Sequence, residues 1–277
     1  MLKMYFIVVN FNNFQYTKLL IDSLIKQDEC NTSFEFKCVV VNNSTDAHDT
    51  DILSKHCENL PYVKVIDCPD NPGYFGGLNR GLELIKGDDK GFVIIGNNDL
   101  EFKSDFCQRL LESQSLYPEN THAICPDVIT VEGRHQNPLV LNRISTFKKL
   151  QYDIYFSHYY IATTLAFIKS SLMMIVKSVI NPAKTVELLP GEIHLGIGAC
   201  YVLTPAFFSH SSKLEFPTFL YGEEAFFSEQ IHLNNGILYF DPSLTVYHAE
   251  SASLSLLPKR RTYEYQKTGY PLYRDFM

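Results

Sequence analysis

The sequence of 277 residues contains no Cys-x-x-Cys pair, although seven cysteines are spread along it. Closely spaced pairs are typical of zinc knuckles, and an even set of cysteines is typical of disulfide frameworks. Several of these cysteines lie inside apolar runs, as Cys38 does before three valines. We therefore interpret them as reduced thiols of a cytoplasmic protein, at Cys30, Cys38, Cys57, Cys68, Cys107, Cys125 and Cys200.

Glycine and proline are also scarce, with 14 and 13 residues. Because 45% of the residues are apolar and 20% are charged, collagen-like and disordered chains are excluded. Basic residues are in deficit, since 24 lysines and arginines face 31 acidic residues and give a net charge of -7. A nucleic acid is therefore not expected as a partner. The length predicts one large domain, or one domain with an appendage.

Long apolar runs are absent as well. The first run ends at the polar residues 10–13, so it predicts a first strand rather than a signal peptide. The other long stretch, residues 159–176, contains Lys169, two serines and two threonines and makes a poor membrane-spanning helix. We expect no segment that crosses a membrane.

The first hundred residues alternate between strand and helix patterns. Apolar runs predict strands at residues 4–10, 36–41 and 92–95, and residues 63–66 predict a further short strand. Helices are predicted between these strands at 16–27, 46–60 and 75–86. Such apolar runs are typical of a parallel sheet that is buried on both faces. The predicted fold class is therefore α/β, with a doubly wound, mostly parallel sheet that binds ligands at the carboxyl ends of its strands. Polar clusters at residues 10–13, 42–46 and 97–99 follow three of these strands.

A basic and aromatic stretch, residues 143–184, interrupts this acidic chain. It has six lysines and arginines against one aspartate, and seven tyrosines and phenylalanines interleave with them. We expect a helical insertion that contacts a membrane surface or an amphipathic partner; the alternative is a basic, solvated face beside a core helix. The tail, residues 258–277, repeats the pattern with Lys259, Arg260 and Arg261 and five aromatic residues, which could bury against a second copy in a homodimer.

Six short segments occur in a set order along the chain. They are IVVNFN at 7–12, VVNNSTD at 40–46, NPGYFGGLNRG at 71–81, NND at 97–99, YGEE at 221–224, and VYH at 246–248 with Ser251 and Ser253. This ordered set resembles the inverting family-2 glycosyltransferases with the A-type fold, especially the rhamnosyltransferase-like bacterial branch that builds surface polysaccharides such as capsule and lipopolysaccharide. The resemblance covers residues 4–253. It implies an A-type domain at 1–257, with a nucleotide-sugar-binding half at 1–100 and an acceptor half at 101–257.

A divalent cation, Mn²⁺ or Mg²⁺, is expected to stabilise the departing diphosphate of such a donor. Asp99, at the mouth of a buried strand, is its expected carboxylate ligand, and Ser104 is expected to cap the helix that follows. The family usually has Asp-x-Asp here, and this chain has Asn97 and Asn98 before the aspartate. Glu101 would point to the same side if the strand continued to it. In the family, a histidine at the position of His248 can complete the metal site.

The acceptor hydroxyl needs a carboxylate that takes its proton. Glu223 and Glu224 precede a predicted helix at 225–234, and we favour Glu224 as the base, although acids in a first helical turn commonly only complement the helix dipole. The family has Glu-Asp at these positions, and its later Asp and Arg are replaced here by Phe226 and Gln230.

The strand ends and the glycine-containing loop supply the expected nucleotide-sugar contacts. Short polar side chains also make ordinary turns and caps, which is the alternative for the cluster at 42–46. The loop at 71–77 is similar to one that cradles phosphate at a helix start. The expected contacts are Asn10, Asn12, Asn42, Asn43, Ser44, Asp46, Gly73, Asn79, Asn97 and Asn98.

The sequence therefore favours a glycosyltransferase that moves a sugar, with inversion, from a nucleotide diphosphate to a glycan acceptor. The acceptor is expected to be lipid-linked at the cytoplasmic face of the membrane. A sugar nucleotidyltransferase would open with a Gly-rich, Arg-containing loop, and Asn10 to Asn13 stand there instead. The second alternative is a catalytically silent nucleotide-binding or scaffold protein, which the replacements at Asn42, Asn97, Phe226 and Gln230 allow.

Overall fold

The computed structural model describes residues 2–28, 34–88, 91–179, 188–217, 219, 221–250 and 259–277. Four residues that the sequence singled out, Cys30, Lys184, Ser251 and Ser253, lie outside this described part.

The described strands form one sheet of nine strands. Their bounds are β1 (Leu2–Asn10), β2 (Phe34–Asn42), β3 (Val63–Asp67), β4 (Phe92–Asn97), β5 (Leu100–Phe102), β6 (Thr121–Thr130), β7 (Gly191–Ile193), β8 (Cys200–Leu203) and β9 (Ile237–His248). The order across the sheet is β3-β2-β1-β4-β8-β6-β9-β5, and β7 pairs with β9. The four neighbouring strands β3, β2, β1 and β4 are parallel, and so are β6 and β9. The strands β8, β5 and β7 pair antiparallel with their neighbours.

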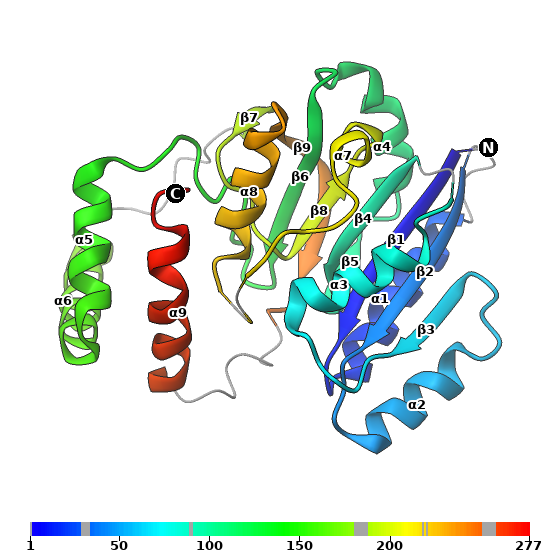
Figure 1. Cartoon of the computed structure of the whole chain (residues 1–277), viewed down its shortest axis with the longest axis horizontal. Coiled ribbons are helices and arrows are strands. Elements are labelled where there is room, and N and C mark those ends of the chain that lie inside the picture. Colours follow the sequence, from blue (N-terminus) through cyan, green and yellow to red (C-terminus); the bar gives the residue numbers. More distant parts are fainter. Residues whose placement is uncertain are drawn as a thin grey trace.

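Helices cover both faces of this sheet (Figure 1). The described helices are α1 (Phe14–Asp28), α2 (Ala47–Cys57), α3 (Gly73–Leu84), α4 (Phe106–Ser113), α5 (Thr146–Ser157), α6 (Tyr159–Val179), α7 (Pro205–His210), α8 (Glu223–Leu233) and α9 (Lys259–Tyr273). One apolar cluster joins the sheet to α1, α2 and α4. A second joins the opposite face to α3, α7 and α8. The predicted α/β class with its doubly wound arrangement is confirmed.

The continuous apolar run of β1 is explained by these two clusters. Met4, Phe6 and Val8 enter the first cluster, and Tyr5 and Ile7 enter the second. Successive side chains of a strand point to opposite faces, so a strand that is covered on both sides has no position for a polar side chain until it ends. In β1 that end is Asn10, the first residue of a predicted polar cluster.

The seven strands and helices predicted in the first hundred residues are all present, with ends shifted by up to three residues. Two local predictions are wrong. Asp105, not Ser104, occupies the N-cap of α4, and no side chain caps it. Glu101 lies on β5 between two buried residues and is exposed, because the short strand turns that position away from the core.

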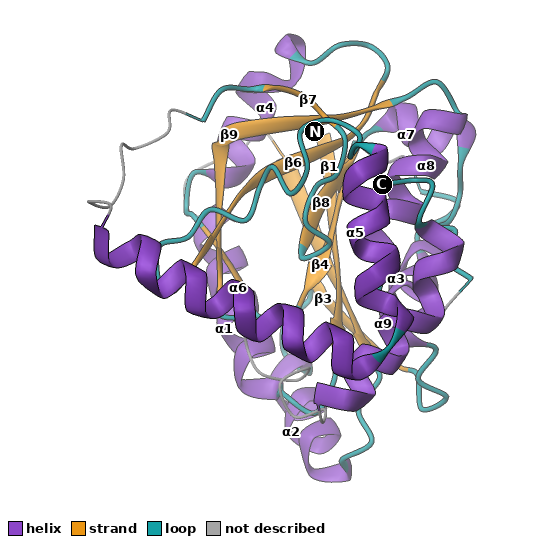
Figure 2. Cartoon of the chain, turned by 90° about the vertical axis from the view of Figure 1, so that its left-hand side faces the viewer, coloured by secondary structure: helices purple, strands orange, loops and turns teal. Residues whose placement is uncertain are grey.

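The basic stretch and the tail form an arm of three helices, α5, α6 and α9, outside the layered body (Figures 1 and 2). Three tail aromatics, Tyr263, Tyr270 and Tyr273, are buried within this chain. The tail is therefore a packed helix, and its aromatic residues are used internally; a homodimer stays a prediction. Within the described ranges, no helix combines the length and the apolar character that crossing a bilayer needs.

Candidate active site

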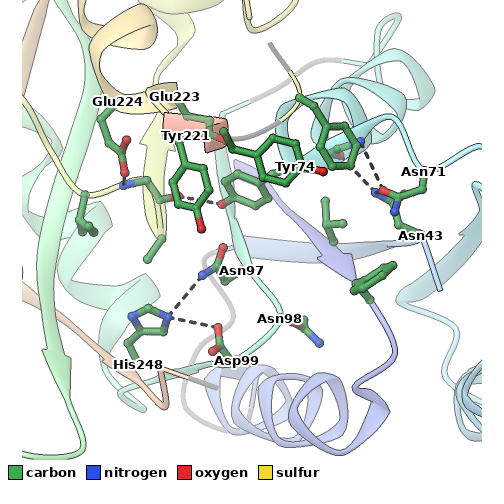
Figure 3. A pocket seen from close by; sticks show the side chains of 18 of the residues that line it. Asn43, Asn71, Tyr74, Asn97, Asn98, Asp99, Tyr221, Glu223, Glu224 and His248 are labelled. Carbon is green, nitrogen blue, oxygen red and sulfur yellow. Dashed lines mark hydrogen bonds and ion pairs between the residues drawn. The ribbon is translucent and has the colours of Figure 1, made fainter. Parts of the chain in front are cut away.

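A cavity of about 570 Å³ opens at the carboxyl ends of β1 and β4. This is the edge of the sheet where the strand order reverses and where doubly wound folds bind their ligands. Figure 3 shows Glu223 and Glu224 on one side of the cavity, and Asp99 and His248 on the other. Eight predicted site residues line it, namely Asn43, Gly73, Asn97, Asn98, Asp99, Glu223, Glu224 and His248.

Asp99 and His248 face each other at one side of the cavity. The antiparallel pairing of β5 with β9 sets His248 opposite Leu100, next to Asp99 in the chain. The Nε2 atom of His248 lies 3.3 Å from Oδ1 of Asp99 and 3.3 Å from Nδ2 of Asn97. Both Asp99 and His248 are buried. A carboxylate and an imidazole therefore share a small, mostly enclosed space.

The far nitrogen of His248 is held by Gln136. Nδ1 of His248 lies 2.8 Å from Oε1 of Gln136, and Nε2 of Gln136 donates to Glu250 at 3.0 Å. Because the amide nitrogen of Gln136 donates to Glu250, its amide oxygen accepts a hydrogen bond from the N–H at Nδ1 of His248. This tautomer leaves a lone pair on Nε2, turned toward Asp99.

A divalent cation fits this corner. The lone pair of His248 Nε2 and the carboxylate of Asp99 are both electron donors, and a cation between them would be attracted by each. In the described part of the chain, no cluster of three or more His, Cys, Asp or Glu side chains is arranged to hold a metal. The protein would thus supply two ligands, and the diphosphate oxygens and water would supply the others.

Glu223 and Glu224 begin α8 directly after a left-handed turn. Gly222 precedes them at φ 99° and Tyr221 at φ 69°. Burial raises the pKa of both carboxyls above the ordinary range of a glutamate, and the charge of Glu224 raises the pKa of Glu223 further. The pair therefore holds a proton more tightly than an exposed glutamate, as a general base near neutral pH must.

The backbone of Gly198 fixes the orientation of Glu224. Its N–H donates to Oε1 of Glu224 at 3.2 Å, and its carbonyl accepts from the Tyr74 hydroxyl at 2.7 Å. A Cβ at residue 198 would come within 3.0 Å of Oε1 of Glu224. Glycine at this position lets the backbone approach the carboxylate closely enough to bond it.

Asn10, Asn42 and Ser44 do not line the cavity but form a network behind it. Nδ2 of Asn10 donates to Asn42, Ser44 and Asp49 at 3.0, 2.9 and 2.8 Å. Oδ1 of Asn10 accepts from Thr17 and from Asn98, which does line the cavity. These residues hold the strand ends together, so any effect they have on a nucleotide runs through their neighbours; direct contact stays a prediction.

Asn43 and Gly73 lie at the cavity wall formed by the start of α3. Nδ2 of Asn43 donates to Oδ1 of Asn71 and to the carbonyl of Gly73, both at 3.2 Å. Among the described residues, the buried Oδ1 atom of Asn43 has no hydrogen-bond partner. A ligand that brings a donor group to this wall would satisfy it.

Asn12, Asp46 and Asn79 also lie away from the cavity lining. The Asn12 side chain accepts from the backbone N–H groups of Thr45 and Asp46, and Asp46 caps α2. Both ends of the Asn79 amide bond the backbone of Leu214, at 2.9 and 2.7 Å. Their hydrogen bonds serve local structure, and a donor contact by any of them stays a prediction.

The two positions that depart from the family pattern on α8 have internal partners. Gln230 donates to the carbonyl of Lys213 at 2.8 Å and accepts from the N–H of Glu215 at 3.0 Å. Phe226 packs edge-on against Phe216 and Phe276. Both side chains therefore stabilise the surroundings of the cavity rather than facing a ligand.

Several lining residues were not singled out as site residues from the sequence. They are aromatic or come from distant segments: Tyr74, Phe219, Tyr221, Arg261 and Tyr265. The tail is basic and aromatic in sequence, but no local pattern in it indicates a place at the cavity. The spacing of four between Arg261 and Tyr265, which puts both on one helix face, was the only available signal.

Residues 5–175 match the sequence family described as Glycosyl transferase family 2. No curated protein matches the sequence. Among solved structures, S. aureus TarS 1-349 in complex with UDP-GlcNAc is similar at a TM-score of 0.59 and 17% identity, covering 93% of this chain and 62% of that one. GalNAc-T7 with UDP, GalNAc and Mn²⁺ is similar at 0.58 and 13%, covering 90% and 44%. This chain therefore spans less than two thirds of either, and at these identities the likeness concerns the fold.

Proposed function

The chain belongs to glycosyl transferase family 2, and we propose that it transfers a hexosyl group from a nucleoside diphosphate to a hydroxyl of a glycan acceptor, with inversion. The observation that carries this proposal is the placement of Glu223 and Glu224 across one cavity from Asp99 and His248. An inverting displacement needs a base on one side of the sugar and a stabilised leaving group on the other.

Glu224 is the proposed base. Its carboxylate takes the proton of the acceptor hydroxyl while that oxygen forms a bond to the anomeric carbon and the bond from this carbon to the diphosphate breaks. The N–H of Gly198 fixes one carboxylate oxygen and leaves the other for the acceptor. Glu223 is adjacent and buried, and burial keeps the pKa of both carboxyls high.

The leaving diphosphate is proposed to lie toward Asp99, His248 and Asn97. A divalent cation, Mn²⁺ or Mg²⁺, held by Asp99 and His248 would supply Lewis-acid stabilisation of its negative charge when bound. The Asn97 amide and the start of α3 at Gly73 offer donor groups to phosphate oxygens. A UDP-sugar is the proposed donor, since both similar structures contain UDP or a UDP-sugar.

Surface polysaccharide biosynthesis is the proposed setting, in the rhamnosyltransferase-like branch that the sequence resembles. The arm supports contact with a membrane. Exposed apolar side chains recur at helical spacing on α5, at Phe147, Leu150 and Ile154, and on α6, at Ile161, Leu165 and Ile168. Such stripes in a basic segment suit the cytoplasmic face of an anionic bilayer. Sedimentation with anionic vesicles tests this, and a Phe147→Ser, Leu150→Ser pair should reduce the bound fraction.

The function is tested by thermal shift with UDP, dTDP, GDP and CDP, each with and without Mn²⁺, followed by turnover of the matching hexose donors. A ligand that binds only the folded state raises the unfolding temperature. We expect one nucleotide to give a shift that Mn²⁺ increases, and Glu224→Gln to lower turnover at least about 100-fold while keeping that shift. Binding without turnover of any donor by the wild-type chain would favour the scaffold alternative. Condensation of a sugar phosphate with a nucleoside triphosphate would favour the nucleotidyltransferase.

A further inference from the structure

One face of α9 lies along the turn that leads into the catalytic pair. Arg261, Tyr265, Gly269 and Tyr273 are spaced by four, so they form one stripe. The Tyr265 ring lies 6.3 Å from that of Phe219. A Cβ at Gly269 would come within 3.3 Å of the Tyr221 carbonyl oxygen, and one at Gly222 within 2.4 Å of the Tyr273 ring. This stripe places Arg261 at the cavity.

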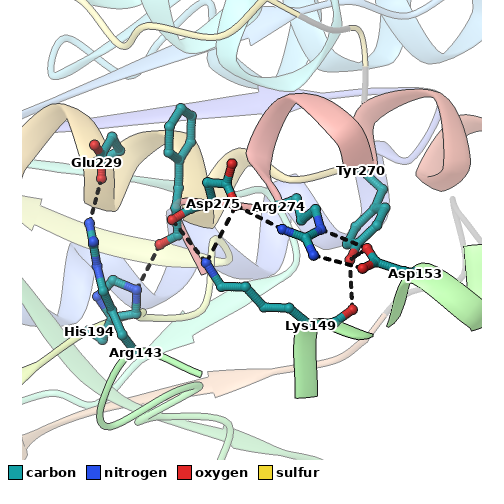
Figure 4. Close-up of polar contacts among 9 residues, drawn as sticks. Arg143, Lys149, Asp153, His194, Glu229, Tyr270, Arg274 and Asp275 are labelled. Carbon is teal, nitrogen blue, oxygen red and sulfur yellow. Dashed lines mark hydrogen bonds and ion pairs between the residues drawn. The ribbon is translucent and has the colours of Figure 1, made fainter. Parts of the chain in front are cut away.

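The opposite face of α9 is fastened to α5 (Figure 4). Arg274 forms two bonds of 2.7 Å with the carboxylate of Asp153, through Nε and Nη2. The Tyr270 hydroxyl donates to the same carboxylate at 2.6 Å. A helix that is anchored on one side and packed against the turn on the other holds its stripe in a defined place.

Acidic side chains outnumber basic ones in the lining of the cavity. Three carboxylates line it, those of Asp99, Glu223 and Glu224, and among the described lining residues Arg261 is the only lysine or arginine. A phosphorylated ligand adds further negative charge. Such a ligand would need a cation, and a guanidinium matches phosphoryl oxygens in geometry as well as in charge.

We propose that Arg261 is a binding residue for a phosphoryl group of the ligand in this cavity, which makes the C-terminal helix part of the substrate site. This inference rests on the proposed function, which gives Arg261 no role, and adds the contact of Arg261 with a phosphoryl group. Nη2 of Arg261 donates to the Tyr265 hydroxyl at 3.2 Å, with the guanidinium carbon 5.7 Å from the centre of that ring. The Arg261 side chain lines the cavity and is exposed, and its guanidinium carries five N–H donors, more than the bond to Tyr265 uses.

Two sources could supply this phosphoryl group. One is the diphosphate of the donor, because Phe219, which Tyr265 contacts, lies against Gly73 at the start of α3. The other is a phosphate carried by the acceptor. Either phosphate would bind through the same guanidinium. The source is therefore identified by the ligand for which a variant at Arg261 loses affinity.

The neighbouring Arg260 offers a matched control. It lies on the same turn of α9, with its guanidinium carbon 5.7 Å from the Tyr159 ring centre, and it does not line the cavity. The variants Arg261→Gln and Arg260→Gln change the same charge on the same helix. Titration calorimetry of the full chain would measure affinity for UDP, for uridine, and for inorganic pyrophosphate added to UDP-saturated protein.

A donor contact predicts that Arg261→Gln weakens UDP binding about tenfold, leaves uridine binding unchanged, and is partly rescued by Arg261→Lys. If Arg261 contacts a phosphate of the acceptor, Arg261→Gln should bind UDP as the wild type does and should lose the binding of pyrophosphate. Arg260→Gln should bind both UDP and pyrophosphate with the affinity of the wild type. If Arg261→Gln matches Arg260→Gln for both ligands while the wild type binds UDP, the inference is wrong and the proposed function stands. If the wild type binds neither ligand, both are wrong.

Discussion

The ring of Tyr273 lies against Gly222, so closely that a Cβ at residue 222 would meet the ring at 2.4 Å. Tyr273 comes from the last turn of α9, and Gly222 immediately precedes Glu223 and Glu224. The C-terminal helix therefore packs against the turn that places the proposed base. A change on either side of this contact is expected to reach the carboxylate pair.

Replacing Gly222 by alanine is expected to destabilise the fold and lower activity. The residue adopts φ 99°, which disfavours any side chain, and the new methyl group would displace Tyr273. Backbone strain and overpacking together should cost about 2 to 4 kcal/mol in the free energy of unfolding. Urea denaturation measures it. Gly133→Ala is the matched control, because residue 133 has φ 77° with no atom within 4 Å of its Cβ, and it should lose only about 1 kcal/mol.

The carboxylate pair predicts how activity depends on pH. The base must be ionised, so kcat/KM should rise with pH through a pKa well above that of an ordinary glutamate. Burial raises the pKa of Glu224, and Glu223 still holds its proton when Glu224 loses its own, so Glu223→Gln should leave the position of this rise nearly unchanged. Glu224→Gln should lose at least about 100-fold in kcat. Glu229→Gln, on the same helix but outside the cavity, should leave the profile unchanged. A rise that moves to lower pH in Glu223→Gln would show instead that Glu223 is already charged when Glu224 loses its proton.

The same pair makes stability depend on pH. The folded chain keeps these protons after the unfolded chain has lost them, so the free energy of unfolding falls as pH rises from about 4.3, the ordinary glutamate pKa, to the raised pKa. In Glu223→Gln this fall should be smaller. Urea midpoints at pH 5 and pH 9 compare the two proteins, and an equal fall in both would contradict the assignment.

The corner of Asp99 and His248 predicts direct binding of Mn²⁺. Calorimetry with Mn²⁺ in the presence of UDP should show a cation-dependent gain in affinity that Asp99→Asn and His248→Asn each remove. Gln136→Leu should reduce this gain about tenfold, because the imidazole loses the partner that fixes its tautomer. His135→Asn is the control, since His135 pairs with Asp127 outside the cavity. Retention of the full gain in His248→Asn would leave Asp99 as the only protein ligand.

The anchor between Asp153 and Arg274 should hold α9 in place. Bonds from Arg274 and from the Tyr270 hydroxyl lower the pKa of Asp153 to about 2. A lowered pKa means that the contribution to stability is present above the ordinary aspartate pKa and is lost as pH falls toward 2. Asp153→Asn should therefore lower both the urea midpoint at pH 7 and the activity. Asp275→Asn removes a more exposed partner of the same arginine and should change neither. Equal urea midpoints and equal activities in the two variants would show that the bonds to Asp153 do not hold α9 in place.

Asn79→Ala separates a structural role from a nucleotide contact. The amide makes two bonds with the backbone of Leu214, so its loss should cost about 2 kcal/mol in the free energy of unfolding. UDP affinity, measured where the variant is folded, should stay within about twofold of the wild type. A tenfold loss of UDP affinity would instead restore the donor contact that the sequence suggested.

The sequence by itself determined the architecture and the edge of the sheet where the site lies. Continuous apolar runs in β1, β2 and β4 can only be buried on both faces, which requires helices on each side. The side chains beyond such strands are the first that may be polar, so the pattern of residues alone assigned Asn43, Asn97 and Asp99 to the edge at which the cavity opens. The local pattern was sufficient to place these residues at that edge, because each of them lies at the end of an apolar run that is itself visible in the sequence.

Only the tertiary structure decided which polar residues face the cavity and which stand behind it. Asn42 and Asn43 are neighbours in the chain, yet Asn42 is turned into the network with Asn10 and Asn43 lines the cavity, because successive side chains at the strand end point to opposite sides. The bond between His248 and Gln136, and the place of Arg261 in the lining of the same cavity as Glu223, join segments far apart in sequence. No local pattern records such contacts, since they depend on how α9 and β9 pack, which the whole chain determines.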